Sequence, residues 1–278
     1  MHSLKFKSYA KINIGLKILS KRDDGFRNIS TLFQEINFYD TLEIGKTEGK
    51  VLFDSNKTWL KNDNTNLCIQ AFNKLKNQFD IGGIKINLKK RIPTFAGLGG
   101  GSSNAATILK GVNHLYKLGL SKKKLQSIGL EIGADVPFFI RGGMQFGEGI
   151  GEELTRINMV LNYKVLLVMP KISIETKWAY EQYDLLLNKS KKPFNIKEKL
   201  QSGNFPFKCF DNDFEKVVIP TYPEIGDILS LLRRSDSQYA GLSGSGSTVF
   251  GVFDDEVDAK SAESILAKKH KTIIVDPI

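Results

Sequence analysis

The hydrophobic pattern of the first ninety residues is mainly that of β-strands. Short runs rich in β-branched and aromatic residues are separated by Asp and Gly turns. We expect strands at LKFKSYAKINIGLKIL, STLFQEINF, DTLEIGK, KVLFDS and IKINLKK. One segment has a different period, because Leu67, Ala71, Leu75 and Phe79 recur every four residues and predict a helix.

From about residue 100 the pattern becomes helical and then mixed. Ala105, Ile108 and Val112 begin an apolar stripe, and SKKKLQSIGLEIG has a serine cap and a glycine end. The strand KVLLVMP, the helix PEIGDILSLLRR and a final β-α-β unit (TVFGVF, DAKSAESILAKKH, KTIIVD) follow. We expect the polar stretch LNKSKKPFNIKEKLQSGNFPF to be a connecting or mobile region. This order predicts an α+β protein with two domains, residues 1–158 and 159–278.

Composition changes this picture little. The 278 residues include 41% hydrophobic residues and carry a formal charge of +10. That charge fits a nucleic-acid binder or an enzyme with anionic substrates. The second is favoured, because the basic residues are dispersed and no RNA-recognition or zinc-finger pattern occurs. Two distant cysteines predict no metal site, and the absence of a long apolar run or signal peptide predicts a cytoplasmic protein without a membrane span.

The stretch TFAGLGGGSSNAA stands directly before the apolar helical stripe. Glycines at a helix start let the backbone approach an anion, and the helix N-terminus offers amide donors and partial positive charge. Ser102 or Ser103 is expected to cap this helix. The stretch lacks the lysine of a P-loop and does not follow the first strand of a βαβ unit. Phosphate binding and a glycine-rich turn with a serine cap both remain open on these residues alone.

Four segments in order resemble a known superfamily. PTFAGLGGGSSNAA resembles the phosphate loop of the galactokinase, homoserine kinase, mevalonate kinase and phosphomevalonate kinase superfamily. SYAKINIGLKI, GADVPFFIRGG and GLSGSGSTVFG resemble its N-terminal strand, catalytic aspartate segment and C-terminal glycine motif. DGFRNISTLFQ and KRIP are typical of one branch, which phosphorylates the 2-hydroxyl of a diphosphocytidyl-linked methylerythritol in the non-mevalonate route to isoprenoids.

The resemblance implies a fold and a set of partners. The fold would be α+β with a ribosomal-protein-S5-like N-terminal domain, a ferredoxin-like C-terminal domain and an active site in the cleft between them. ATP would be the phosphoryl donor, entering with Mg²⁺, and the other partner would be a small-molecule substrate. Neither nucleic acid nor membrane is expected as a partner, and the protein would be a monomer or a homodimer.

Two residues are implied in catalysis. The resemblance makes Asp135 the base that takes the proton of the substrate hydroxyl, whereas the residues around it alone indicate a turn or helix-cap aspartate. Lys11 would keep that aspartate ionised and offset charge on the transferred phosphoryl group. Without the resemblance, Lys11 would be an exposed strand lysine.

The resemblance also implies binding residues. Those for ATP are Pro93, Gly97, Leu98, Gly99, Gly100, Gly101, Ser102, Ser103, Asn66 and Lys90, and those for the substrate are Asn13, Phe26, Arg27, Thr176 and Tyr180. Asn13 is expected on the same strand face as Lys11. Phe26 would stack on the cytosine, and Arg27 stands where the family usually has a histidine that hydrogen-bonds to the base. Arginine only donates hydrogen bonds, so the cytosine carbonyl oxygen or ring nitrogen would accept from it.

Two alternatives compete with this interpretation. Another member of the superfamily, such as a homoserine or mevalonate kinase, would share the glycine loop but not the DGFRNISTLFQ segment. A catalytically silent sugar or nucleotide sensor on the same fold would not need both Lys11 and Asp135.

Overall fold

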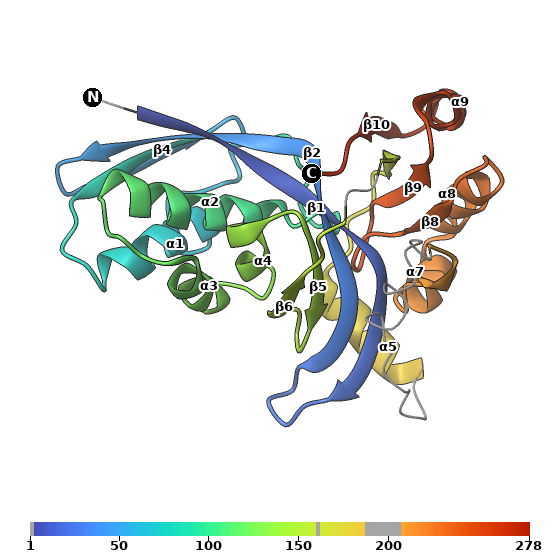
Figure 1. Ribbon diagram of the computed structural model, residues 1–278, viewed down its shortest axis with the longest axis horizontal. Coiled ribbons are helices and arrows are strands. Elements are labelled where there is room, and N and C mark those ends of the chain that lie inside the picture. Colours follow the sequence, from blue (N-terminus) through green and yellow to red (C-terminus); the bar gives the residue numbers. More distant parts are fainter. Residues whose placement is uncertain (1–2, 160–161, 187–206) are drawn as a thin grey trace. The chain divides into compact units, whose positions relative to one another are not determined.

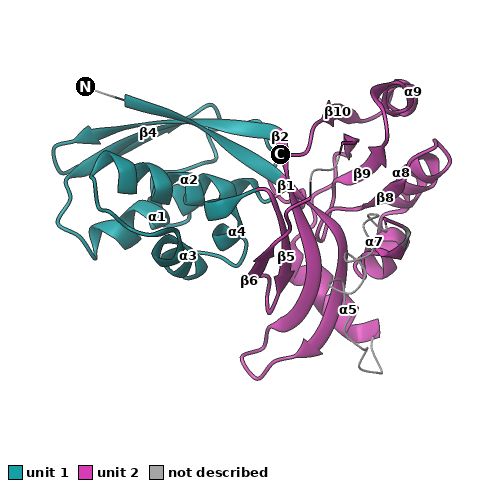
Figure 2. Cartoon of the chain, viewed as in Figure 1, with its two compact units in different colours: residues 1–10, 38–93, 99–142 teal, residues 11–37, 94–98, 143–278 magenta. Residues whose placement is uncertain are grey.

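The structure, a computed structural model, describes residues 3–159, 162–186 and 207–278. The chain forms two compact units (Figure 2). Unit 1 consists of residues 1–10, 38–93 and 99–142, and unit 2 of residues 11–37, 94–98 and 143–278. The chain passes between the units several times, so the domain boundary expected at residues 158/159 falls inside unit 2.

Two long strands run through both units. Strand β1 (Ser3–Lys21) pairs with strand β2 (Arg27–Thr47). The prediction of separate strands at STLFQEINF and DTLEIGK is wrong, because β2 continues through Asp40 without a turn. An aspartate normally favours a turn, but here its carboxylate is fully buried and accepts hydrogen bonds from neighbouring segments of unit 1.

Unit 1 is a sheet with helices gathered beside it (Figure 1). Strand β4 (Gly83–Lys89) pairs antiparallel with the last part of β2, and β3 (Val51–Ser55) pairs parallel with β4. The helices are α1 (Leu67–Lys76), α2 (Gly100–Leu115), α3 (Lys122–Leu130) and α4 (Val136–Arg141). As predicted, Ser121 caps α3, accepting a hydrogen bond from the amide of Lys124. The helix ends at Leu130, before the glycine expected to stop it.

Unit 2 contains a four-stranded antiparallel sheet in the order β10–β7–β9–β8. Its strands are β7 (Lys164–Met169), β8 (Tyr239–Leu242), β9 (Val249–Phe253) and β10 (Lys271–Val275). The predicted β-α-β unit is formed by β9, α9 (Glu256–Leu266) and β10, with β7 inserted between its two strands. In addition, β5 (Met144–Glu148) pairs with the first part of β2, and β6 (Glu153–Arg156) pairs with β5.

The core of unit 2 lies between its sheet and its helices. The helices are α5 (Thr176–Leu186), α7 (Glu215–Thr221), α8 (Pro223–Arg233) and α9, with a short 3₁₀ turn at Phe207–Cys209. Side chains such as Val168, Phe214 and Leu229 form one buried apolar cluster. The combination of sheets and helices confirms the α+β class. The polar region expected near residues 187–207 lies, apart from its last residue, outside the described residues.

Candidate active site

Lys11 is a buried lysine in unit 2, so the interpretation as an exposed strand lysine is wrong. Only 4% of the residue is exposed. Its Nζ donates to Oδ1 of Asn13 at 2.5 Å, as expected for two residues on one face of β1, and lies 5.5 Å from the ring centre of Phe33. Burial of an ammonium group is costly unless hydrogen bonds and charges compensate it. An aliphatic side chain would avoid that cost, so the lysine at this buried position indicates a functional role.

The second glycine run, GLSGSGS, lies against Lys11 and Asn13 in unit 2. The hydroxyl of Ser243 accepts from the amide of Asn13 at 3.3 Å and donates to the carbonyl oxygen of Gly97 at 2.9 Å. A Cβ atom added to Gly244 would lie 3.3 Å from Oδ1 of Asn13 and 3.6 Å from Nζ of Lys11. Three segments that are far apart in the sequence therefore meet around the Lys11 side chain.

Gly97 is required by this close approach. A Cβ atom at this position would lie 1.8 Å from the carbonyl oxygen of Ser243, and the residue has a φ of +73°. Any other side chain would displace the Ser243 backbone. The carbonyl of the neighbouring Leu98 accepts a hydrogen bond from the amide of Lys11 at 3.1 Å, which fixes this part of the loop to β1.

The second part of the glycine loop belongs to unit 1 and starts helix α2. Gly99 is the N-cap residue, in the left-handed conformation with φ 66° and ψ 19°, and α2 begins at Gly100. The expectation that Ser102 or Ser103 caps the helix is wrong, because both residues already lie in its first turn. The first three residues of the helix, Gly100, Gly101 and Ser102, are therefore all small. Their backbone N–H groups have no carbonyl acceptor within the helix.

Ser103 and Ser102 differ in their surroundings. Ser103 is 2% exposed, and its hydroxyl is 2.7 Å from that of Ser8 on β1. Ser102 is half-buried. Of the two hydroxyl groups, that of Ser102 is the more accessible to a ligand at this helix end.

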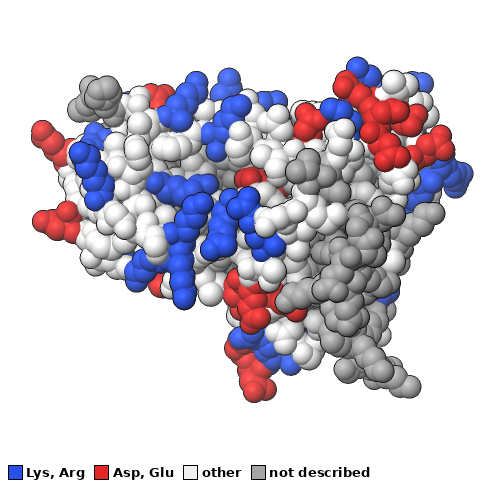
Figure 3. All heavy atoms as spheres, viewed as in Figure 1, with Lys and Arg blue, Asp and Glu red and all other residues white. Residues whose placement is uncertain are grey.

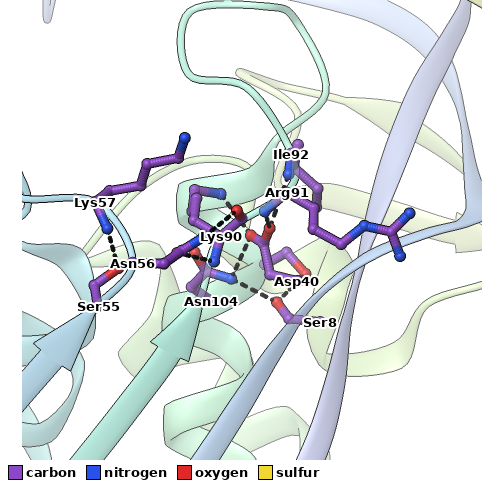
Figure 4. A network of polar contacts seen from close by, with 10 residues as sticks. Ser8, Asp40, Ser55, Asn56, Lys57, Lys90, Arg91, Ile92 and Asn104 are labelled. Carbon is purple, nitrogen blue, oxygen red and sulfur yellow. Dashed lines mark hydrogen bonds and ion pairs between the residues drawn. The ribbon is translucent and has the colours of Figure 1, made fainter. Parts of the chain in front are cut away.

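Lys90 and Asn66, both assigned to ATP, are buried in unit 1. Nζ of Lys90 donates to Oδ2 of Asp40 at 2.5 Å (Figure 4). Asn66 caps helix α1: its Oδ1 accepts from the amide of Cys68 at 2.9 Å, and its Nδ2 donates to the carbonyl of Lys61 at 3.0 Å. These contacts give both side chains a structural task beside the expected contact with nucleotide.

Asp135 is half-buried at the start of α4 in unit 1. The helix is held firmly, since Nζ of Lys110 donates to the carbonyl of Phe139 at 2.8 Å and Phe138 and Phe139 are buried. The side chain of Asp135 makes no capping hydrogen bond with the backbone of α4. The fold thus supplies a rigid support for this carboxylate.

Phe26 and Arg27 lie at the β1–β2 hairpin of unit 2. Phe26 is 59% exposed, so its ring is accessible for stacking. Nε of Arg27 donates to Oδ1 of Asp184 in α5 at 2.5 Å, and its Nη1 donates to the carbonyl of Leu19 at 3.0 Å. These two bonds use two of the five N–H groups of the guanidinium and fix its plane.

The two remaining substrate candidates lie on helix α5. The hydroxyl of Thr176 is 3.0 Å from that of Ser245 in the second glycine run. Tyr180 packs edge-on against the buried ring of Phe214, with 4.9 Å between ring centres. Thr176 is thereby placed beside the motif that surrounds Lys11, whereas Tyr180 contributes part of its ring to the core.

Many Lys and Arg side chains lie over unit 1 in the view of Figure 3.

Among the described residues there is no cluster of three or more His, Cys, Asp or Glu that could hold a metal ion, and no helix there is long and apolar enough to cross a bilayer. Burial raises the pKa of Cys68 to about 12, so this thiol stays protonated and chemically inert at neutral pH.

Comparison with known proteins identifies the family. Residues 66–143 match the model of the GHMP kinases N terminal domain, and residues 196–272 match the model of the GHMP kinases C terminal domain. The chain belongs to the GHMP kinase family.

Within this family, several relatives match the chain over nearly its full length and carry the same name. A protein of Pelodictyon phaeoclathratiforme named 4-diphosphocytidyl-2-C-methyl-D-erythritol kinase is 38% identical, with 100% of this chain and 98% of the relative covered. A protein of the same name from Alkaliphilus oremlandii is 39% identical over 98% of this chain and 95% of the relative. A crystal structure of 4-(cytidine 5'-diphospho)-2C-methyl-D-erythritol kinase has a TM-score of 0.82 and 27% identity, covering 98% of both chains.

Three residues that contact the predicted site residues are not apparent from the sequence pattern: Asp40, Asp184 and Ser243. Asp40 stands between two runs of strand-like residues, where an aspartate suggests a turn and not a buried carboxylate. Ser243 stands in a motif that was recognised, but its contacts with residues 13 and 97 depend on the fold. Asp184 has no signal in the sequence, since it is one of several charged residues on an ordinary amphipathic helix.

Proposed function

We propose that this protein is an ATP-dependent kinase that phosphorylates the 2-hydroxyl of 4-diphosphocytidyl-2-C-methyl-D-erythritol in non-mevalonate isoprenoid precursor biosynthesis. The convergence of buried Lys11 with Gly97 and the second glycine run supports a kinase, because a cation beside two glycine-rich motifs is an arrangement suited to binding phosphate. The full-length relatives of that name support this substrate over those of other family members. Such an enzyme would work in the cytoplasm as a monomer or a homodimer.

In the proposed reaction, the 2-hydroxyl oxygen attacks the γ-phosphorus of ATP. An oxygen–phosphorus bond forms, the bond from the γ-phosphorus to the bridging oxygen breaks, and ADP leaves. Asp135 accepts the hydroxyl proton, and the ammonium of Lys11 stabilises negative charge on the transferring group. Mg²⁺ would supply neutralisation of phosphate charge, and because it is normally held by substrate phosphates it would enter with the nucleotide.

The start of α2 is the proposed phosphate-binding element. The amides of its first turn carry the positive end of the helix dipole, and the small residues 99–103 leave room for phosphate oxygens. Pro93, Gly97 and Leu98 would complete the nucleotide site, with Asn66 and Lys90 supporting it from their buried positions.

Gly99→Val is expected to raise the KM for ATP by about tenfold or more, which corresponds to roughly 1.4 kcal/mol of binding free energy. A branched side chain is disfavoured at a φ of 66°. It would also fill the space that the proposal gives to a phosphate oxygen. Steady-state kinetics with varied ATP would measure the effect. Gly119→Val is the matched control, because Gly119 has a φ of +68° with no atom within 4 Å of an added Cβ. If both variants bind ATP equally well, the loop has only a structural role.

We propose that Phe26 stacks on the cytosine and that Arg27 donates a hydrogen bond to it. The exposed ring of Phe26 fits the first task. Asp184 holds Nε of Arg27, so the guanidinium is already oriented when a base arrives. Asn13, Thr176 and Tyr180 are the other proposed substrate contacts.

Arg27→Ala is expected to weaken binding of the diphosphocytidyl substrate by about 1.5–3 kcal/mol, the range for a hydrogen bond that involves a charged group. The KM for ATP should hardly change. Arg22→Ala is the matched control, since Arg22 lies in the same hairpin but pairs with the exposed Asp24. An equal loss for substrate and ATP, or an equal effect of the two variants, would contradict the assignment.

A panel of acceptors tests the function as a whole. The purified protein would be supplied with ATP and magnesium and offered the diphosphocytidyl substrate, mevalonate, phosphomevalonate and homoserine in a coupled ADP-release assay. We expect kcat/KM to be highest for the diphosphocytidyl substrate. A preference for any of the other three acceptors would refute the proposed substrate while retaining a kinase, and no ADP release with any acceptor would favour a silent sensor.

A further inference from the structure

Asp40 is a fully buried carboxylate whose four recorded partners are all hydrogen-bond donors. Its Oδ1 accepts from the backbone amides of Arg91 at 2.6 Å and Ile92 at 2.8 Å. Its Oδ2 accepts from Nζ of Lys90 at 2.5 Å and from Nδ2 of Asn104 at 3.0 Å. All of these groups lie in unit 1, and Figure 4 shows them converging on the Asp40 side chain.

These bonds join two segments that are separate in the sequence. Lys90, Arg91 and Ile92 follow strand β4, and Asn104 lies in the second turn of α2. The link to α2 is reinforced, because Nδ2 of Asn104 also lies 2.9 Å from the hydroxyl of Ser8, which contacts Ser103. Asp40 thus fixes the chain before Pro93 relative to the helix that begins after the glycine loop.

The backbone of Lys90 is held from its other side as well. Its amide donates to Oδ1 of Asn56 at 2.7 Å, and its carbonyl accepts from Nδ2 of the same residue at 3.2 Å. A Cβ atom added to Gly100 would lie 2.7 Å from Nζ of Lys90 and 2.8 Å from Cγ2 of Ile92. The first residue of α2 therefore lies against the side chains of Lys90 and Ile92, and Asp40 accepts from the ammonium of the first and the backbone amide of the second.

The donor set explains why an aspartate is needed. An ionised carboxylate accepts on both oxygens, whereas an asparagine would turn one NH₂ group toward donors. In either orientation of that amide, its NH₂ group would face two of the donors that now bond to Asp40. Those buried donors would lose their acceptor. Loss of the negative charge would also leave the Lys90 ammonium buried without its counter-ion.

We propose that Asp40 is a positioning residue for nucleotide binding. It sets the geometry of residues 90–92, which include Lys90 and lead to Pro93, and of the start of α2; both stretches contain proposed ATP contacts of unit 1. This inference rests on the proposed function only in so far as ATP binds at these stretches. Asp40 itself is fully buried, at 0% exposure. Its effect passes through the backbone of Arg91 and Ile92 and through Asn104.

Asp40→Asn is expected to weaken binding of a non-hydrolysable ATP analogue by about 10–100-fold, the equivalent of one charged hydrogen bond. Isothermal titration calorimetry of the full chain with the magnesium complex of the analogue would measure this. The KM for the diphosphocytidyl substrate should stay within about threefold, because the proposed contacts of that substrate lie in unit 2.

Asp213→Asn is the matched control. Asp213 is also 0% exposed, pairs with Lys216 and accepts from the amide of Ile18 and the hydroxyl of Tyr183, all in unit 2. The same substitution there should lower thermal stability without changing affinity for the analogue. Equal analogue affinity in the Asp40→Asn variant and the wild type, or an equal loss in both variants, would overturn the inference.

A second variant keeps the test decisive if Asp40→Asn fails to fold. Asn104→Ala removes the hydrogen bonds from α2 to Asp40 and Ser8 but leaves the other three donors of Asp40 in place. It should weaken binding of the analogue by about three- to tenfold, with the KM for the acceptor unchanged. Unchanged analogue affinity in this variant would overturn the inference. Because the measurement needs no acceptor, a wild-type protein that binds the analogue but phosphorylates no diphosphocytidyl alcohol would refute the proposed substrate and leave the role of Asp40 standing. A wild-type protein that does not bind the analogue would refute both.

Discussion

Replacing Asp135 by asparagine is expected to lower kcat by roughly 10²–10⁴-fold, the usual contribution of a general base. Asparagine has the size of aspartate but cannot accept the proton of the substrate hydroxyl. In phosphoryl transfer the protein mainly positions the reactants and stabilises charge, so the remaining rate reflects those contributions. Both Michaelis constants should stay within a few-fold, because ground-state binding does not require proton transfer.

Single-turnover and steady-state measurements with both substrates varied would provide these constants. Asp255→Asn is a useful comparison, because Asp255 caps α9 through bonds from the amides of Val257 and Asp258. That variant tests what the same substitution does at the start of a helix without any role in catalysis, and its kcat should be unchanged. A folded Asp135→Asn enzyme with near-native kcat would eliminate Asp135 as the base.

Lys11→Ala should lower kcat by roughly 10²–10³-fold, the range for removing one preorganised group that stabilises transition-state charge. The ammonium of Lys11 is buried, donates to Asn13 and lies near the second glycine run, and alanine leaves no positive charge there. Lys11→Met preserves most of the volume and should show nearly the same loss of kcat, which separates the effect of charge from that of a cavity.

Lys17→Ala is the control on the same strand, because Lys17 pairs with the exposed Asp211 and should leave kcat near the wild-type value. The double variant of Lys11 and Asp135 should lose less activity than the product of the two single losses, because both groups act on the same step. Fully multiplicative losses would show that the two residues act independently. Recovery of kcat in Lys11→Met would assign Lys11 to packing instead of catalysis.

Much of the secondary structure could be predicted because its signals are local. The apolar residues that recur every four positions from Leu67 predict α1, and Ser121 predicts the start of α3. The error at β2 has a local cause as well: Asp40 usually favours a turn, and only its four buried donors make it compatible with a continuous strand. Similarly, the glycines identified the start of α2, but the helix begins before the serines and not after them.

The candidate site was predicted as a set of motifs and not as an arrangement. Lys11, Gly97 and the second glycine run were each singled out, and the structure brings them together in unit 2. For Arg27 the loss of the family's histidine was visible, but its partner Asp184 lies 157 positions further along the chain. The assignments of Asp135 to catalysis and of residues 99–103 to ATP remain predictions that the variants above test.

The sequence by itself determined the family, the α+β class and the residue types available for phosphate binding, because glycine conformation, helix starts and strand alternation depend on near neighbours. Only the tertiary structure decided that Lys11 is buried, that Ser243 joins Asn13 to Gly97, and that Asp40 accepts from residues 50 to 64 positions away. A hydrogen bond depends on distance and direction in space, and a polar residue carries no local mark of the distant donor that it will meet. The buried polar contacts that position a site are therefore the part of this protein that its sequence pattern leaves open.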